Sequence, residues 1–348
     1  MTFRTQVLIS VFLLTFSSVG QDPAKKSNPS NQTDKVDSQS VLASAQTLAR
    51  QARYDEAIAQ LQDLAAKHPE VKGISHEMGV AYYQKGDYPR ASDYLKKAIA
   101  EDPADNEATQ LLGLSYYLSG RPTEAIPLLE KVQTWFPRAN VDASYILGIC
   151  YIQSKDYLHA QKAFAKMFNV PPDSAQSSLF TARMLLRQEY GPVAKEYAQK
   201  AVAADPKLPL AHFLLGELYL FESQIPESIA EFEKELAINP AYAPAYYKLA
   251  DAYSRIQKFD EAERLLQQSI WLDSTATGPY VLMGKVLEKK GETELAIRAL
   301  QRALTMDPNN PMTHHLLGQA YRDAGRAQEA EQELQTAKRL QGSQAEKQ

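Results

Sequence analysis

Residues 72–105 read KGISHEMGVAYYQKGDYPRASDYLKKAIAEDPAD, and this stretch decides the fold. Residues 74–85 form one amphipathic segment that ends at Gly86, and glycine accepts the left-handed conformation that follows many helices. Asp87 comes next as a helix N-cap, and Pro89 suits the first turn of a helix, where its missing N–H costs nothing. The stretch therefore predicts two short helices joined by a tight turn.

The same pattern returns about every 34 residues along the chain. A small residue is followed three positions later by tyrosine at Gly79/Tyr82, Gly113/Tyr116, Gly148/Tyr151, Gly216/Tyr219, Ala250/Tyr253 and Gly318/Tyr321. An alanine holds a second equivalent position at Ala57, Ala91, Ala125, Ala160, Ala194, Ala262, Ala296 and Ala330. A proline that closes each unit stands at Pro69, Pro103, Pro137, Pro172, Pro206, Pro240 and Pro308. A period of this length indicates stacked helical units and not one globular core.

This pattern of repeated residues resembles the tetratricopeptide repeat family, and it covers nearly everything after residue 37. The resemblance implies an all-α, right-handed superhelical solenoid of about nine antiparallel helix pairs, with the first helix of each pair lining a concave face. The expected organisation is a signal peptide at 1–20, a disordered linker at 21–37, the solenoid at 38–342 and a polar tail at 343–348. A solenoid offers binding surface more readily than an active site.

The repeat departs from its pattern between the third and fourth units. The spacing from Pro137 to Pro172 is 35 residues, and Gln133 stands where the other units carry an apolar residue that packs on the next repeat. We therefore expect a looser or re-angled joint at this position. Pro127 falls inside a predicted second helix, where it should remove a backbone hydrogen bond and kink the helix. The last helix is polar on its outward side, at Glu331 and Lys338, which predicts a capped end.

The N-terminus has the features of a secretory signal. Arg4 precedes an apolar run over residues 7–16, and Ser18-Val19-Gly20 offers small residues before a cleavage point at Gln21,. The run is short for a membrane span, which needs roughly 20 residues. The expected location is therefore periplasmic or secreted, and the alternative is an uncleaved membrane anchor formed by residues 7–19.

Composition and motifs argue against catalysis, metal binding and nucleic-acid binding. The net charge of −4 excludes the basic footprint of a nucleic-acid-binding protein,. Cys150 is the only cysteine and reads as a small buried residue, while His314 and His315 are adjacent and point in different directions on a helix,. No hydrolase, nucleotide-binding or zinc-protease motif is present. The repeats occupy nearly all of the sequence, so no segment remains to form a catalytic domain. The sequence therefore predicts no catalytic residue, no cofactor, no metal and no enzymatic activity.

The resemblance also implies which first-helix positions face the concave groove. These candidate peptide-binding residues are His76, Val80, Tyr83, Gln110, Leu114, Tyr117, Tyr145, Ile149, Ile152, Arg183, Phe213 and Tyr247. They predict a groove that is apolar and aromatic through its middle, followed by charged positions such as Asp251, Lys285 and Arg322. A contiguous exposed apolar strip of this kind suits a peptide or an amphipathic helix. The alternative is that a tightly wound superhelix buries part of the strip itself.

The function that follows is a non-enzymatic scaffold or assembly factor of the cell envelope, with a protein or peptide partner in its groove. The Lys, Asn and Arg residues by which chaperone adaptors of this family hold a peptide carboxylate are not found at these positions. Two rivals remain, a self-associating structural protein and a small-ligand binder that uses the groove. Contact with the membrane is expected only if the N-terminal segment stays uncleaved.

Overall fold

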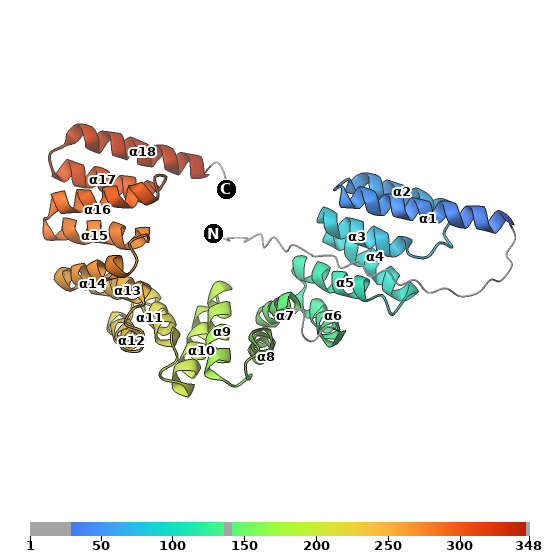
Figure 1. Ribbon diagram of the computed structural model, residues 1–348, viewed down its shortest axis with the longest axis horizontal. Coiled ribbons are helices and arrows are strands. Elements are labelled where there is room, and N and C mark those ends of the chain that lie inside the picture. The colour runs from blue at the N-terminus through green and yellow to red at the C-terminus, as the bar shows by residue number, and fades with distance from the viewer. Residues whose placement is uncertain (1–28, 136–140, 346–348) are drawn as a thin grey trace. The chain divides into compact units, whose positions relative to one another are not determined.

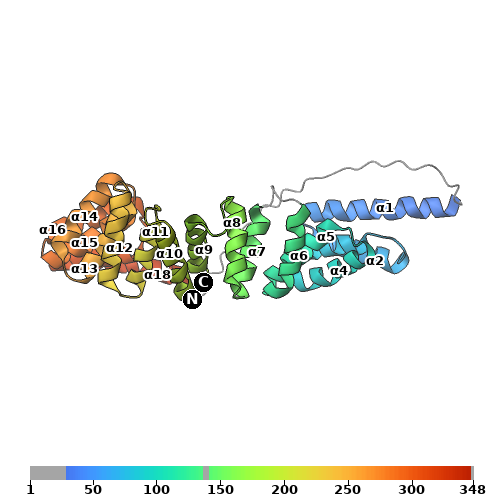
Figure 2. The same ribbon diagram turned by 90° about the horizontal axis from the view of Figure 1, so that it is seen from below.

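The computed structural model describes residues 29–135 and 141–345, and every regular element in them is an α-helix. The helices follow one another in antiparallel pairs, as α15 to α18 show in Figure 1 and α7 and α8 show in Figure 2. This arrangement confirms the predicted solenoid of helix pairs. The chain divides into two compact units between Ala108 and Thr109, a boundary that falls inside α5.

Each predicted repeat corresponds to one helix pair. The first unit holds α1 (Pro29–Arg50), α2 (Tyr54–Lys67), α3 (Ile74–Lys85), α4 (Tyr88–Glu101) and the start of α5 (Asn106–Leu118). The second unit continues with α6 (Pro122–Trp135), α7 (Val141–Gln153), α8 (Tyr157–Phe168), α9 (Ala175–Arg187), α10 (Gly191–Ala204), α11 (Ala211–Phe221) and α12 (Ile225–Ile238). It ends with α13 (Ala243–Arg255), α14 (Phe259–Leu272), α15 (Thr277–Lys290), α16 (Thr293–Met306), α17 (Pro311–Asp323) and α18 (Ala327–Ala345).

The turn between the two helices of a pair has the same geometry in all nine described pairs. One residue is left-handed, and the N–H of the following residue donates to the carbonyl five positions back, as in Asp87 to Tyr82 at 2.9 Å and Arg326 to Tyr321 at 2.8 Å. This is the hydrogen bond of a Schellman motif. The left-handed residue is a glycine at positions 86, 120, 291 and 325, but it is Ala52, Lys155, Glu189, Ser223 or Gln257 in the other turns.

The small first-helix residue of the repeat makes room for a large side chain 16 positions later. A Cβ atom on Gly79 would lie 2.6 Å from Cγ of Leu95, and one on Gly284 would lie 2.5 Å from Cγ of Leu300. Leu95 and Leu300 are buried, so the side chain on the second helix fills the space above the glycine. The equivalent alanines such as Ala91 are also buried, and together these positions form the core of each pair.

The repeated tyrosine does more than fill space. The hydroxyl of Tyr253 donates to Glu233 at 3.1 Å, and that of Tyr321 lies 2.8 Å from Nε2 of Gln301. Glu233 and Gln301 hold equivalent positions on the second helix of the preceding pair. The tyrosine therefore links these two repeats to the ones before them.

Helical backbone extends past the predicted solenoid limits at both ends. Helix α1 begins at Pro29, so residues 29–37 of the predicted linker are helical, and α18 continues to Ala345 through part of the predicted tail. The predicted signal peptide lies outside the described residues. Within residues 29–135 and 141–345, no helix combines the length and hydrophobicity that a membrane span requires.

Helix α6 is assigned as continuous across Pro127. The extra residue between the third and fourth pairs belongs to the connection over 136–140, which lies outside the described residues. Even so, Tyr151 donates its hydroxyl to Glu130, the position equivalent to Glu233 and Gln301. The insertion is therefore accommodated without loss of this repeat-to-repeat hydrogen bond, and a changed angle at the joint stays a prediction.

Candidate functional site

The first unit carries three of the predicted groove residues on α3. His76, Val80 and Tyr83 are all half-buried. The ring of Tyr83 lies 5.8 Å from that of Tyr88, and burial raises the pKa of Tyr83 to about 12. Tyr83 is therefore a neutral ring at the edge of the core and offers one aromatic face to a ligand.

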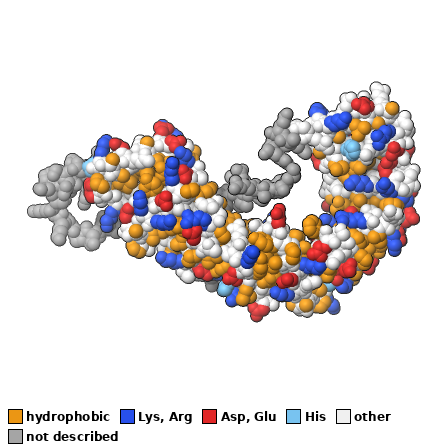
Figure 3. All heavy atoms as spheres, turned by 180° about the vertical axis from the view of Figure 1, so that it is seen from behind, with side chains coloured by type: hydrophobic (Ala, Val, Ile, Leu, Met, Phe, Trp, Pro, Cys, Tyr) orange, Lys and Arg blue, Asp and Glu red, His pale blue; other side chains and the backbone are white. Residues whose placement is uncertain are grey.

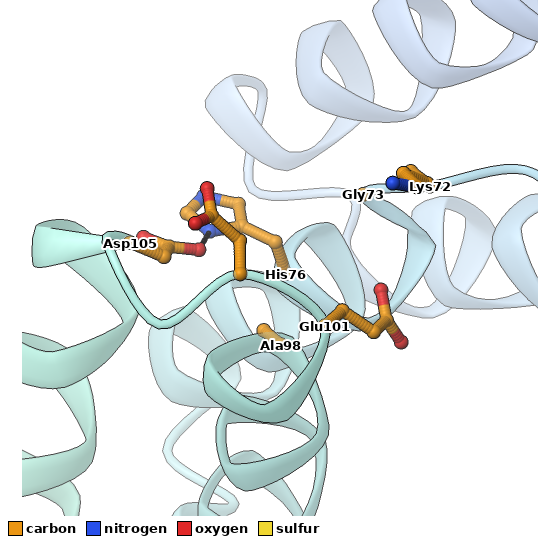
Figure 4. Close-up of a pocket in the computed structure, with 7 residues that line it drawn as sticks. Lys72, Gly73, His76, Ala98, Glu101 and Asp105 are labelled. Carbon is orange, nitrogen blue, oxygen red and sulfur yellow. Dashed lines mark hydrogen bonds and ion pairs between the residues drawn. The ribbon is translucent and has the colours of Figure 1, made fainter.

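His76 also borders a cavity of about 440 Å³. Lys72, Gly73, Ala98, Glu101, Asp102 and Asp105 complete its lining (Figure 4). The ring of His76 points toward Asp105 from α3, and Nδ1 lies 2.6 Å from Oδ2 of Asp105. Asp105 in turn accepts the N–H of Ala108 at 2.8 Å, so its carboxylate also caps the start of α5.

The polar groups around this cavity satisfy one another. The hydroxyl of Ser75 donates to Glu101 at 2.5 Å, and Nε2 of His76 lies 3.8 Å from Glu107. Burial lowers the pKa of His76, but the Asp105 carboxylate outweighs burial and raises it overall. The arrangement fixes the connection between α4 and α5.

The structure corrects the middle of the predicted groove in the second unit. Leu114 is 7% exposed, Ile149 1% and Ile152 0%, so these side chains belong to the core. The reason is the close packing of first helices, since Tyr117 on α5 lies near Tyr145 and Cys150 on α7, and its pKa is raised by burial and by these neighbours. The alternative in which the superhelix buries part of its own apolar strip therefore holds for these three residues.

The other predicted residues of the second unit remain accessible. Gln110, Tyr117, Tyr145, Phe213 and Tyr247 are half-buried, and Arg183 is exposed. Phe213 contacts Tyr242 edge-on, with ring centroids 5.1 Å apart and planes at 84°. A Cβ atom on Gly278 would lie 3.2 Å from the Tyr247 hydroxyl, so this tyrosine packs on the N-terminal turn of α15. The surface that remains is a row of partly exposed rings on separate helices.

Charged side chains lie on α11 and α13 together with these rings and continue on α15. Lys248 on α13 lies 2.9 Å from Glu217 on α11, and Arg255 lies 3.0 Å from Asp251 one turn earlier. Glu288 on α15 has its pKa raised by burial and by the nearby Asp323 carboxylate. This end of the surface therefore carries ion pairs on α11 and α13 and two neighbouring carboxylates on α15 and α17.

A second cavity lies away from every predicted groove residue, between α6 and α8. Its volume is about 400 Å³, and its lining consists of Glu130, Gln133, Thr134, Leu147, Tyr151, His159, Lys162, Ala163 and Lys166. Sequence reasoning did not propose these residues as a site. The available signal was Gln133, which marked the joint but not the hollow beside it.

A buried and a half-buried histidine, His212 and His314, occupy equivalent positions three repeats apart. Nδ1 of His212 lies 2.5 Å from Glu231 and its Nε2 lies 3.0 Å from the carbonyl of Pro206. His314 makes the same two contacts, with Glu333 at 2.5 Å and the carbonyl of Pro308 at 2.9 Å. Each histidine ties the loop before its helix to the second helix of its own pair, which is a structural role.

Neither cysteine chemistry nor a metal centre emerges from the described side chains. Cys150 is buried, and burial raises the pKa of its thiol to about 12, so the reactive thiolate is disfavoured,. No group of three or more potential ligands is gathered among the described residues. On the face that Figure 3 draws, basic and acidic side chains are interspersed with hydrophobic ones.

Comparison with known families agrees with this geometry. Models described as tetratricopeptide repeat match residues 39–70, 76–139, 245–280 and 281–345, together more than half of the chain. The chain belongs to the tetratricopeptide repeat family. Members of this family are scaffolds that bind protein partners, and they are typically not enzymes. No curated protein matches the sequence.

Several solved tetratricopeptide repeat structures resemble parts of the chain. MamA is 24% identical over 47% of this chain and 96% of its own, with a TM-score of 0.44. YrrB, described as having an unusual peptide-binding site, is 20% identical over 52% of this chain and 94% of its own, with a TM-score of 0.45. PilF of Pseudomonas aeruginosa is 19% identical over 59% of this chain and 97% of its own, with a TM-score of 0.48.

Proposed function

We propose that this chain is an exported scaffold of the cell envelope that holds a segment of a partner protein against its first helices. The observation that carries the proposal is a set of accessible side chains on successive first helices of the second unit. Tyr145, Phe213 and Tyr247 hold one position of the repeat, and Arg183 lies one turn after the buried Leu179 that holds this position in α9. Arg183 on α9 is exposed, while Tyr145 on α7, Phe213 on α11 and Tyr247 on α13 are half-buried. Aromatic residues and arginine are the residue types that contribute most to protein interfaces.

The physical argument is that these rings are already ordered. Phe213 is held between Phe232 and Tyr242, with centroids 5.8 Å and 5.1 Å away, so a partner that covers its free face orders no further rotamers. Side chains fixed before binding reduce the entropy that association costs. The buried Leu114, Ile149 and Ile152 act beneath this surface as support and not as contacts.

Site-specific photo-crosslinking in the native cell tests this surface. A photoreactive residue at position 183 should give one discrete adduct, because Arg183 lies within the proposed surface. The same residue at Leu158, which is 58% exposed on the second helix α8, is the control and should not give that adduct. Adducts of equal yield at both positions, or none at position 183, would contradict the proposed surface.

A complementary experiment uses substitution. The double variant Arg183→Glu, Tyr145→Ala should no longer co-purify with the partner that crosslinks to position 183. Its circular dichroism spectrum should be unchanged. Ile149→Glu is unsuitable for this purpose, because a charge at a position 1% exposed should unfold the pair,. Continued co-purification with the double variant would remove the support for the surface.

Export is a separate part of the proposal and rests on the sequence of residues 1–20. N-terminal sequencing of the protein from its native cell should find Gln21 first, together with recovery in the soluble envelope fraction. An intact N-terminus in the membrane fraction would support the anchored alternative. Recovery in the cytoplasm would overturn export.

Self-association is the rival that a specific observation favours. Phe221 is 85% exposed and Trp271 77% exposed, and aromatic side chains are enriched at the cores of protein interfaces,. Light scattering across a concentration series separates the two functions. A molar mass that equals one chain at every concentration supports the scaffold. A dimer that is lost in the Phe221→Ser or Trp271→Ser variant supports self-association.

A further inference from the structure

The cavity between α6 and α8 exists because two positions depart from the repeat. At the position of Gln133, the fourth and eighth pairs carry Phe168 and Leu304, which pack on the next first helix at Phe180 and Leu316. The centroids of Phe168 and Phe180 are 3.9 Å apart. Gln133 packs differently, because it bonds to polar groups on both helices of the fourth pair.

Its amide donates from Nε2 to the hydroxyl of Ser144 at 2.8 Å and accepts at Oε1 from Nζ of Lys166 at 3.2 Å. The second position is Ala163 on α8, which is smaller than Tyr94 of α4, Tyr197 of α10 and Leu265 of α14 at the equivalent position, although α16 also has an alanine there, Ala299. The polar Gln133 on α6 and the small Ala163 on α8 leave a cavity of about 400 Å³ beside Leu147.

The cavity has an apolar floor and a basic rim. Leu147 and Ala163 are buried. Lys162 and Lys166 are four residues apart on α8, so they project from the same face of the helix. Among the described residues Lys162 has no ion-pair partner, and the hydrogen-bond partner of Lys166 is the neutral amide of Gln133.

The acidic group in the lining is already engaged. Glu130 accepts the hydroxyl of Tyr151, whose ring stacks on His159 with centroids 5.3 Å apart. His159 in turn bonds through Nδ1 to Asp156 at 2.7 Å. Glu130 keeps its negative charge in this hydrogen bond, so Lys162 and Lys166 together give the lining an excess of positive charge.

We propose that this cavity is a second binding site, distinct from the first-helix surface, that takes an acidic segment of a partner protein. A carboxylate of the segment would lie between Lys162 and Lys166, and an apolar neighbour would cover Leu147 and Ala163. Charge complementarity selects this occupant over a basic or neutral segment, because charged contacts fix specificity and association rate.

The test uses the full chain and a fluorescein-labelled peptide of alternating Glu and Leu, followed by fluorescence anisotropy at low salt. Lys162→Glu with Lys166→Glu should weaken binding about ten-fold or more. Arg298→Glu with Arg302→Glu places the same charges at the equivalent positions of α16 and should leave binding unchanged. Equal weakening by both pairs would overturn the site, because it would show attraction by the overall charge.

Two further arms make the result specific. Ala163→Leu should fill the cavity and abolish binding without lowering the melting temperature, since α14 already carries Leu265 at this position. A matched Gln/Leu peptide should bind about ten-fold or more weakly than the Glu/Leu peptide. Unchanged binding to Ala163→Leu, equal binding of the two peptides, or full competition by inorganic phosphate at the peptide's own concentration would each overturn the proposal.

Discussion

A Cβ atom placed on Gly216 would lie 2.7 Å from Cε1 of Phe232, which is completely buried. The two residues belong to the two helices of one pair, and their spacing of 16 residues recurs in other pairs. The glycine therefore sets how closely the helices of a pair approach each other.

Gly216→Ala should accordingly destabilise the protein by about 1–3 kcal/mol, the usual cost of overpacking a filled core. Gly342→Ala is the control, because no heavy atom lies within 4 Å of a Cβ at that helical position. Chemical denaturation of both variants measures the difference. A Gly216→Ala variant as stable as the control would show that Phe232 can move aside.

The left-handed turns predict a stabilising substitution. Lys155 has φ of 60° at the position where other turns carry Gly86 or Gly291. A left-handed conformation costs a residue with a side chain roughly 1–2 kcal/mol, and a glycine at the same position avoids this cost. Part of the stabilisation is lost, because glycine has more conformational freedom in the unfolded chain.

Lys155→Gly should therefore raise the free energy of unfolding by about 0.5–1 kcal/mol, and Gly86→Ala should lower it by a similar amount. Thermal melts of the two variants provide the measurement. A change of the same sign in both would contradict the conformational explanation.

The link between Tyr321 and Gln301 should be measurable as a coupling. Tyr321→Phe removes a hydrogen bond of 2.8 Å between consecutive repeats and should cost about 1 kcal/mol,. In a double-mutant cycle with Gln301→Ala, the second change should cost little once the hydroxyl is gone. Strictly additive effects would show that the two side chains do not interact.

The pair formed by His76 and Asp105 should make stability depend on pH. The folded pKa of His76 is raised above 6.5, so its contribution is complete below that pH and is lost as pH rises through the folded value,. The folded pKa of Asp105 is lowered below 3.8, so its contribution is present above that pH and is lost as pH falls through the folded value,.

His76→Gln should therefore destabilise the protein most between about pH 4 and 6.5 and least in alkali. Denaturant midpoints of the variant and the parent across this range give the test. A difference that is constant with pH would mean that His76 contributes by packing alone.

The raised pKa of Glu288 predicts a pH dependence of stability opposite to that of Asp105. Burial and the charge of Asp323 raise its pKa, so its ionised form is disfavoured in the folded chain. Its contribution is favourable below its unfolded pKa and declines as pH rises through the folded value. Glu288→Gln should raise the melting temperature at pH 7 and have no effect near pH 3, and a lower melting temperature at pH 7 would contradict this explanation.

The sequence predicted the helix pairs correctly because their determinants are local. Gly86, Asp87 and Pro89 act within a few residues of one another, and the 34-residue period repeats the same local choices. It also marked the position between the third and fourth pairs where we expect an irregular joint, because Gln133 breaks an apolar position that can be recognised without a structure. Residues of the surface such as Arg183 and Tyr145 followed from the same register.

The tertiary structure decided which of these side chains are accessible and where the space lies. Leu114, Ile149 and Ile152 share a register with Tyr117 and Tyr145, but packing between repeats buries the aliphatic residues and leaves the larger rings partly exposed. The cavity beside Gln133 depends on Ala163, a residue 30 positions away that no local rule connects to it. Local propensity thus determines the repeat, whereas burial and cavities depend on contacts between residues distant in sequence, and those contacts exist only once the helices are stacked.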